Sequence, residues 1–239
     1  AAVVNLAGEN IAGIWTPAKK TRLYDSRVEG TRLLARTLAA LPGERRPGVL
    51  VCASAIGYYG DRPADQPLQE DAPPGDGFMA RLVRDWEAAA DAAREAGVRV
   101  VHLRFAVVLD PQGLLLQVAT MATRLGLGAT IGDGRQPFPW VTRDEVARLV
   151  PYALDRPDLE GAVNAVAPQR TTNREFVDTL ARVLRRPGDR ATHHLGVQHT
   201  DSPVRDLPGL VDAPGRGLRP LRRRCCLSRL MALILAYGL

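Results

Sequence analysis

The sequence is poor in cysteine, in aromatic residues and in long apolar runs. Its three cysteines, among 239 residues, lack the spacing of metal ligands, which argues against a disulfide framework or a zinc site and for reduced thiols. No apolar run reaches the roughly 20 residues of a membrane span, and no signal peptide is visible, so we expect a cytoplasmic protein. With 46% hydrophobic residues, the chain can nevertheless bury a core of its own.

Lysine and glutamate are missing from the last part of the chain, where the net charge of +6 is concentrated. Ten arginines and four aspartates lie between residues 185 and 239, among prolines and glycines. Without interleaved aromatic residues or an amphipathic helix, this composition indicates neither a nucleic-acid partner nor a membrane partner. We therefore expect residues 188–239 to form an irregular arginine-rich tail, either a divergent end or the product of out-of-frame translation.

Before that tail, apolar strand-like runs alternate with helical patterns, which favours an α/β layered sheet. The apolar runs predict strands over residues 3–6, 49–53, 98–105 and 163–166. Helical periodicity and N-capping residues predict helices over 16–41, 77–96 and 112–125, and helices that begin near Thr142 and Thr172. Because helical crossovers join parallel strands, we expect the first three strands to be parallel neighbours in that order, with helices on both faces of the sheet.

Several motifs, taken in order, resemble the epimerase-like group of the atypical, extended short-chain dehydrogenases/reductases. They are Asn5–Ile11, Asp25–Arg27, Ser54–Gly60, Asp85–Glu87, Arg104–Leu109 and Gly132–Gln136. The resemblance covers roughly residues 1–187 and implies a Rossmann-like dinucleotide-binding domain there, with smaller substrate-side elements from about residue 110. It also implies NADP or NAD as the cofactor and a small or nucleotide-linked molecule as the substrate.

The family's first strand, its G-x-x-G-x-x-G turn and the helix behind that turn have no counterpart in the sequence. We therefore expect an N-terminally truncated Rossmann-like domain. In this superfamily the glycine-rich turn holds the pyrophosphate with backbone N–H groups at a helix N-terminus. A chain without that turn is expected to bind a dinucleotide weakly and to be poorly soluble.

The resemblance places the cofactor beside residues that follow the expected strands. Ala7 and Gly8 would offer bare backbone to a ribose or to the nicotinamide side, although a glycine that ends a strand is also an ordinary feature. Ser54 follows the second strand, where its hydroxyl could bind the substrate or merely cap the turn. The third strand leads into a segment against which relatives hold the nicotinamide ring: Arg104, Phe105 and Ala106. Arg104 is equally suited to a salt bridge at the strand end.

Three further residues are predicted to face the substrate: Asn10, Arg135 and Trp140. The planar guanidinium of Arg135, in a glycine-flanked loop, suits bidentate recognition of a phosphate or a carboxylate. Trp140 could stack on a base or line the pocket, and the alternative is that it fills an internal interface.

The proton-transfer residues of the family are largely absent. Typical members carry a tyrosine and, four residues later, a lysine that lowers the pKa of the phenol. The matching positions here are Phe78 and Leu82, and the position of the family's asparagine is Arg27. Of the four groups, Ser54 remains. Tyr58 is the candidate that could supply a phenol nearby, although an aromatic residue there is also ordinary packing.

These features leave two classes of function open. The first is an NAD(P)-dependent, epimerase-like oxidoreductase that acts on an unknown small or nucleotide-linked substrate, with Ser54 and Tyr58 as catalytic residues. The second is a cofactor-binding or redox-sensing module with little chemistry, or an inactive fragment, which the loss of the tyrosine and lysine favours. Turnover of reduced cofactor with a panel of carbonyl compounds distinguishes the two.

Overall fold

The computed structural model describes residues 1–62, 67–125, 130 and 133–185, and the chain forms two compact units. The first unit contains residues 1–60, 70–105 and 147–165, and the second contains the described parts of 61–69, 106–146 and 166–239. Within the described part of the chain, no helix is long and apolar enough to cross a lipid bilayer. The expected arginine-rich tail lies outside the described residues.

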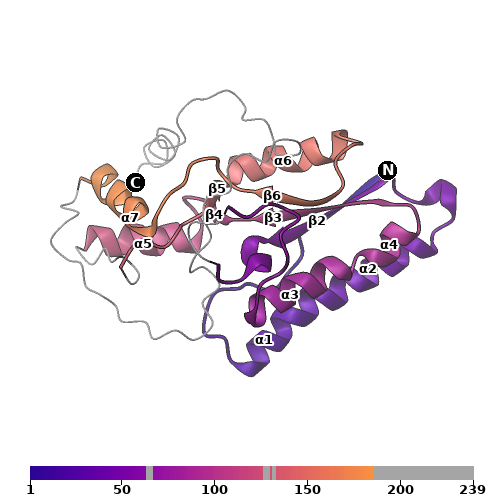
Figure 1. Cartoon of the computed structure of the whole chain (residues 1–239), viewed down its shortest axis with the longest axis horizontal. Helices are drawn as coiled ribbons and strands as arrows, with labels where there is room; N and C mark the ends of the chain where they lie inside the picture. The colour runs from indigo at the N-terminus through magenta and orange to yellow at the C-terminus, as the bar shows by residue number, and fades with distance from the viewer. Residues whose placement is uncertain (63–66, 126–129, 131–132, 186–239) are drawn as a thin grey trace. The chain divides into compact units, whose positions relative to one another are not determined.

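A four-stranded parallel sheet is the centre of the first unit (Figure 1). Its strands lie in the order β1-β2-β3-β6 and are β1 (Ala2–Asn5), β2 (Val49–Ala55), β3 (Arg99–Phe105) and β6 (Gly161–Ala165). The register pairs Asn5 with Cys52 and Ser54 with Arg104. This confirms the predicted parallel arrangement and order of the first three strands.

Helical crossovers connect the neighbouring strands. The chain passes from β1 to β2 through α1 (Pro17–Tyr24), the π-helical turn η1 (Asp25–Glu29), α2 (Gly30–Ala40) and the short 3₁₀ turn η2 (Gly43–Arg45). It passes from β2 to β3 through the 3₁₀ turn η3 (Ile56–Tyr59), α3 (Gly77–Ala88) and α4 (Asp91–Glu95). The predicted helix over 77–96 is therefore interrupted, because the backbone tightens where Ala90 N–H donates to Glu87 O at 3.2 Å.

Both faces of this sheet are covered by helices. Since successive residues of a strand point to opposite sides, Leu50 and Cys52 pack against the layer of α2 and α4, while Val49 and Val51 pack against α6 (Arg143–Asp155). Figure 1 shows α2, α3 and α4 on one side of β2 and α6 on the other. Each fully buried aliphatic side chain contributes about 1.5–3 kcal/mol to this core. The Rossmann-like architecture predicted from the sequence is confirmed.

The second unit has a small sheet and two packed helices. Strands β4 (Val107–Leu109) and β5 (Trp140–Thr142) pair in parallel, a pair that the sequence analysis did not predict. Helices α5 (Leu114–Arg124) and α7 (Asn173–Val183) share an apolar cluster with them. Helix α7 begins with the predicted capping box, in which Thr172 and Glu175 satisfy each other's backbone N–H groups.

Candidate functional site

The candidate site lies where the three neighbouring strands β1, β2 and β3 end, which is the edge at which α/β sheets bind ligands. Ala7 and Gly8 follow β1 and are exposed. Ser54 and Arg104 are register partners near the ends of β2 and β3, and both are 3% exposed. The parallel sheet thus brings the residues predicted after each strand to one edge, with Phe105 half-buried at the end of β3 and Ala106 buried next to it.

Glu87 of α3 connects Ser54 to Arg104. The Ser54 hydroxyl donates to Glu87 Oε1 at 2.6 Å. Arg104 donates from Nε and from Nη2 to the two carboxylate oxygens of Glu87, each at 2.8 Å. The arginine and the carboxylate therefore form a buried, bidentate ion pair, and the serine hydroxyl is hydrogen-bonded to that pair.

The electrostatics of this pair determine what Ser54 can offer a ligand. Burial opposes ionisation of Glu87, but the hydrogen bonds and charge of Arg104, together with the hydrogen bond from Ser54, outweigh it and hold the pKa of Glu87 below its ordinary value. Burial alone would lower the pKa of Arg104, but Glu87 and Tyr59 together raise it above its ordinary value. Both groups are charged, and an ionised carboxylate can only accept. The Ser54 proton is therefore directed to Glu87, which leaves Ser54 Oγ as a hydrogen-bond acceptor toward a ligand.

Two tyrosines complete the surroundings of Arg104. The guanidinium carbon lies 3.6 Å from the centre of the Tyr58 ring, a cation–π contact. Tyr59 accepts from Arg104 Nη1 at 2.9 Å and donates to Asn164 Oδ1 of β6 at 2.7 Å. Burial raises the pKa of Tyr59, against the opposing effect of Arg104, so Tyr59 is a neutral structural phenol. Tyr58 is half-buried beside Arg104, and its predicted catalytic role stays a prediction.

A close contact between two chain segments fixes the position of the tyrosines. Gly75 N–H donates to Tyr58 O at 2.9 Å, and a Cβ atom added to Gly75 would lie 2.0 Å from Tyr59 O. Gly60 has a φ of +61°, a conformation that residues with a Cβ rarely adopt. The two glycines allow the backbones to touch, so the turn that carries Tyr58 and Tyr59 is held by main-chain contacts.

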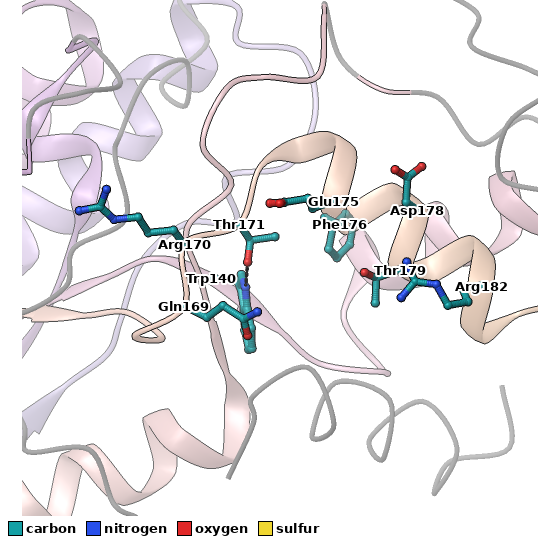
Figure 2. A pocket seen from close by; sticks show the side chains of 9 residues that line it. All are labelled: Trp140, Gln169, Arg170, Thr171, Glu175, Phe176, Asp178, Thr179 and Arg182. Carbon is teal, nitrogen blue, oxygen red and sulfur yellow. Dashed lines mark hydrogen bonds between the residues drawn. The ribbon is translucent and has the colours of Figure 1, made fainter. Parts of the chain in front are cut away.

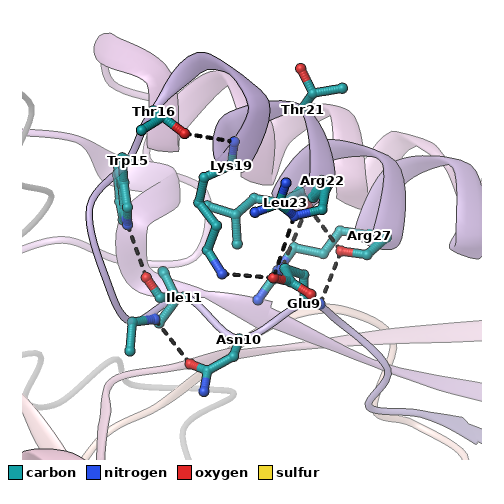
Figure 3. A network of polar contacts seen from close by, with 12 residues as sticks. Glu9, Asn10, Ile11, Trp15, Thr16, Lys19, Thr21, Arg22, Leu23 and Arg27 are labelled. Atoms are coloured by element: carbon teal, nitrogen blue, oxygen red, sulfur yellow. Dashed lines mark hydrogen bonds and ion pairs between the residues drawn. The ribbon is translucent and has the colours of Figure 1, made fainter.

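The loop after β1 is held by polar contacts with α1 and η1 (Figure 3). Glu9 N–H donates to Ser26 Oγ at 3.0 Å, and Lys19 Nζ donates to Glu9 Oε1 at 2.7 Å. The Asn10 side chain accepts from Ala12 N–H at 2.9 Å, a turn within the loop, and Asn10 is exposed. Asn10 therefore shapes the loop locally, and its contact with a substrate stays a prediction.

Gly8 faces an arginine of the neighbouring helical turn. A Cβ atom added to Gly8 would lie 3.1 Å from Cζ of Arg27, and the two Nη atoms are almost as close. The missing side chain of Gly8 thus makes room for the guanidinium of Arg27, a contact that the sequence analysis did not foresee. The contact of Ala7 and Gly8 with a dinucleotide stays a prediction.

Phe78, at the position of the family's acid/base tyrosine, is part of an aromatic cluster. Its ring meets that of Trp15 edge to face, with centroids 5.9 Å apart, and Lys20 Nζ lies 5.2 Å from the Phe78 ring centre. The side chain has no ionisable group, so a proton must be exchanged elsewhere if the chain catalyses a reaction.

Arg135 and Trp140 belong to the second unit. The Trp140 indole is 2% exposed and donates to Thr171 Oγ1 at 3.1 Å, so it is largely a core residue. Its edge borders a shallow hollow of about 210 Å³ beside α7 (Figure 2). Arg135 is exposed, and its backbone N–H donates to Asp133 Oδ1 at 2.9 Å. The predicted contacts of both residues with a substrate stay predictions.

Glu87 is the functional residue that sequence reasoning missed. It follows Ala80 and Val83 at helical spacing, and both of those are buried, so a carboxylate on the buried face of α3 was a readable signal. Asn164 and Glu70 also join the network, because Asn164 N–H donates to Glu70 Oε1 at 3.0 Å and Glu70 O accepts from Arg104 at 3.0 Å. These contacts join distant parts of the sequence and left no local signal.

No three histidine, cysteine, aspartate or glutamate side chains gather as metal ligands among the described residues. Cys52 is a free, buried thiol of β2, and burial raises its pKa to about 12. At neutral pH this thiol is protonated and unreactive.

Comparison with known proteins identifies relatives over most of the chain. An epimerase family protein of Mycobacterium tuberculosis is 40% identical over 187 residues, which cover 78% of this chain and 60% of that protein. The human epimerase family protein SDR39U1 is 38% identical over 189 residues, which cover 77% of this chain and 63% of that protein. The chain therefore spans about three fifths of the length of these relatives.

Solved structures include relatives of the same kind. The crystal structure of human SDR39U1 (isoform 2) with NADPH matches with a TM-score of 0.71 and 36% identity, covering 78% of this chain and 63% of that one. A nucleoside-diphosphate sugar epimerase from Corynebacterium glutamicum matches with a TM-score of 0.64 and 30% identity, covering 81% of this chain and 40% of that one. A family model matches residues 1–166, and the resemblance to the epimerase-like group is confirmed: the chain belongs to the NAD dependent epimerase/dehydratase family.

Proposed function

We propose that the chain is an NAD(P)-dependent, epimerase-like oxidoreductase that acts on a small or nucleotide-linked substrate. The observation that carries the proposal is the ordered hydroxyl of Ser54 at the ligand-binding edge of a sheet that belongs to this family. The human relative solved with NADPH supports a nicotinamide dinucleotide, and the Corynebacterium relative supports a nucleotide-linked substrate.

The residues at the strand ends fit one end of such a dinucleotide. Gly8 is exposed, and the space that its missing Cβ leaves is occupied by the guanidinium of Arg27, so a ligand would meet the exposed backbone of the loop. Ala7 and Gly8 would border the ribose, and the backbone at Phe105 and Ala106 would border the nicotinamide. The sequence contains no G-x-x-G-x-x-G turn, so the pyrophosphate is assigned to none of these residues. The bound nicotinamide would supply hydride transfer.

The side chains of the site have separate tasks in this proposal. The Ser54 hydroxyl donates its hydrogen bond to Glu87, so Ser54 Oγ accepts a hydrogen bond from a substrate hydroxyl and orients it. Arg104 keeps Glu87 ionised, and it also holds Tyr58 by its ring. The Tyr58 phenol is the proposed group for proton exchange, because Phe78 has none to offer.

A second function has a specific observation in its favour. Phe78 occupies the acid/base position in an aromatic contact with Trp15, which is an arrangement suited to packing and not to proton transfer. The alternative is therefore a module that binds a nicotinamide dinucleotide and catalyses little.

Cofactor binding and cofactor turnover, measured separately on the full chain, test both proposals. NADPH and NADH fluorescence is titrated first, and cofactor oxidation is then followed at 340 nm with carbonyl compounds and nucleotide-linked keto sugars. Turnover that falls at least tenfold in Ser54→Ala supports the enzyme. Binding without turnover supports the module, and the absence of both binding and turnover refutes the two proposals together.

A further inference from the structure

Arg27 is a half-buried arginine at the ligand edge of the sheet, and it forms no ion pair with any residue that the structure describes. Its guanidinium lies against Gly8, just after β1, and 5.2 Å from the centre of the Trp86 ring. The register of β1 and β2 pairs Asn5 with Cys52, so Gly8, just after β1, and Ser54, near the end of β2, lie toward the same edge of the sheet. The Ser54 side chain meets Glu87 of α3 and the Arg27 guanidinium lies over the adjacent Trp86, so both side chains are on the α3 side of the sheet.

The hydrogen-bond donors of Arg27 are largely unused. Among the described residues, the hydrogen bond of its side chain is a long one, from Nη1 to Leu23 O at 3.4 Å. Other arginines of the same unit make more hydrogen bonds: the half-buried Arg46 and Arg99 each donate to three backbone carbonyl groups, and the buried Arg104 donates to both carboxylate oxygens of Glu87. Arginine has more N–H donors than any other side chain, and a half-buried one normally uses them.

The nearest carboxylate is engaged elsewhere. Glu9 binds Lys19 at 2.7 Å and is approached by Arg22 at 3.8 Å, and it forms no ion pair with Arg27 in the described part of the chain (Figure 3). Burial lowers the pKa of Arg27, and the charge of Glu9 raises it, yet the guanidinium stays protonated. Lys19, Arg22 and Arg27 thus act on one carboxylate, and Arg27 is the one whose guanidinium lies against Gly8.

The backbone that carries Arg27 is also unusual. Residues Asp25–Glu29 form the π-helical turn η1 between α1 and α2, and this turn holds both Ser26, which binds the loop after β1, and Arg27. Single π turns inside helices are rare and are frequent at functional sites. The turn directs two consecutive side chains toward the loop that follows β1.

We infer that Arg27 binds an oxyanion of the substrate, a carboxylate or a phosphate, beside the hydroxyl that Ser54 accepts. That the anion belongs to a substrate rests on the proposed function, whereas the anion site itself is inferred from the geometry. The partly exposed guanidinium, which lies between Gly8 and the Trp86 ring, would bind the two oxygens in a bidentate manner. The substrate class is therefore an anionic alcohol or its oxidised form.

Anion binding is measured on the full chain without any dinucleotide, so its result is independent of turnover. The ¹⁵N-labelled chain is titrated with inorganic phosphate and, separately, with acetate, at constant ionic strength set with chloride. The readout is the indole N–H signal of Trp86, assigned by elimination with Trp15→Phe and Trp140→Phe. The Trp86 ring is close to Arg27, and its N–H donates to Thr31 at 3.0 Å.

We expect the Trp86 signal to shift and to saturate as the anion is added. The affinity for the anion should fall at least tenfold in Arg27→Gln and several-fold in Arg27→Lys. Arg22→Gln is the matched control, because it removes the same charge from an exposed residue near Glu9, and it should change the affinity less than twofold. A response to phosphate alone assigns a phosphorylated or nucleotide-linked substrate, and a response to acetate assigns a carboxylic acid.

Two outcomes would overturn the inference. The first is that Arg27→Gln binds the anion as tightly as the unmodified chain does. The second is that Arg22→Gln loses as much affinity as Arg27→Gln, which would mean that the anion responds to the overall positive charge of this region and not to a site at Arg27. A dispersed spectrum of Arg27→Lys shows that the fold is intact, so a loss of affinity in that variant reports on the site. If the chain binds the anion but does not turn over the cofactor, the anion-site proposal stands and the oxidoreductase proposal is refuted.

Discussion

Replacing Glu87 with alanine should be among the most destabilising single changes in the first unit. The substitution removes the carboxylate that accepts from the Ser54 hydroxyl and from Nε and Nη2 of Arg104. Arg104 itself stays buried, with 3% of its surface exposed. An arginine left in such a place keeps the cost of its burial without the attraction that offset it.

The magnitude follows from the geometry. Breaking a buried ion pair by removing one partner costs about 3–5 kcal/mol, and leaving the Ser54 hydroxyl without its acceptor adds about 1 kcal/mol. Domains of this size have a free energy of unfolding of about 5–15 kcal/mol, so the loss is a large part of the total. The double variant Glu87→Leu with Arg104→Met removes both charges together and should lose about 2 kcal/mol less than the sum of the single changes.

Urea unfolding followed by tryptophan fluorescence measures these losses, with Arg156→Ala as the reference for an ordinary pair. Arg156 and Asp158 are 48% and 64% exposed, so that change should cost only about 0–1 kcal/mol. A loss below about 1 kcal/mol in Glu87→Ala, or strict additivity in the double variant, would refute the reasoning.

Three further outcomes are expected. If the chain turns over cofactor, Ser54→Ala should lower kcat by at least tenfold while Phe78→Leu changes it less than threefold, and equal losses would mean that the site is misplaced. Burial lowers the pKa of His102 to about 4, so the unfolded chain takes up a proton first, and stability should fall by up to about 3 kcal/mol as the pH drops from about 6.5 to about 4; urea midpoints against pH should lose this slope in His102→Gln. Gly75→Ala should cost more than about 2 kcal/mol in the same assay, since its Cβ would meet Tyr59 O, whereas Gly43→Ala, with open space around it, should be nearly neutral.

The central strands of the larger sheet were predictable because burial on both faces imposes a continuous apolar run, whereas β4 and β5 are too short to carry such a run. Val49 to Ala53 is such a run, and the helices on either side of it fix the parallel order of β1, β2 and β3. The capping box at Thr172 was equally local, since both of its partners lie within one turn of α7. Patterns of this kind depend on neighbours in sequence, and they were read correctly.

The interior of the site was not predictable in the same way. Arg104 was assigned equally to a ligand and to a salt bridge, and in the structure its guanidinium is bound internally to Glu87, a residue 17 positions away in sequence. The π turn at Asp25–Glu29 also has no sequence signature that separates it from the helices beside it. Such features arise from long-range packing, and only the folded chain brings the partners together.

The contact between Gly60 and Gly75 also has a consequence for how this fold can vary. Because the backbones at Gly60 and Gly75 are in contact, the two ends of the segment between them lie side by side. Within that segment Glu70 is tied to the site, because its carbonyl oxygen accepts from Arg104 and its carboxylate accepts from Asn164 N–H. Changes of length that leave Glu70 and the two glycines in place should therefore not displace Tyr58 or Arg104. Each doubling of the segment's length would cost only about 0.6 kcal/mol in closure entropy. The length between Gly60 and Glu70 is therefore the part of this unit that can change at least cost, while the Ser54–Glu87–Arg104 network stays fixed.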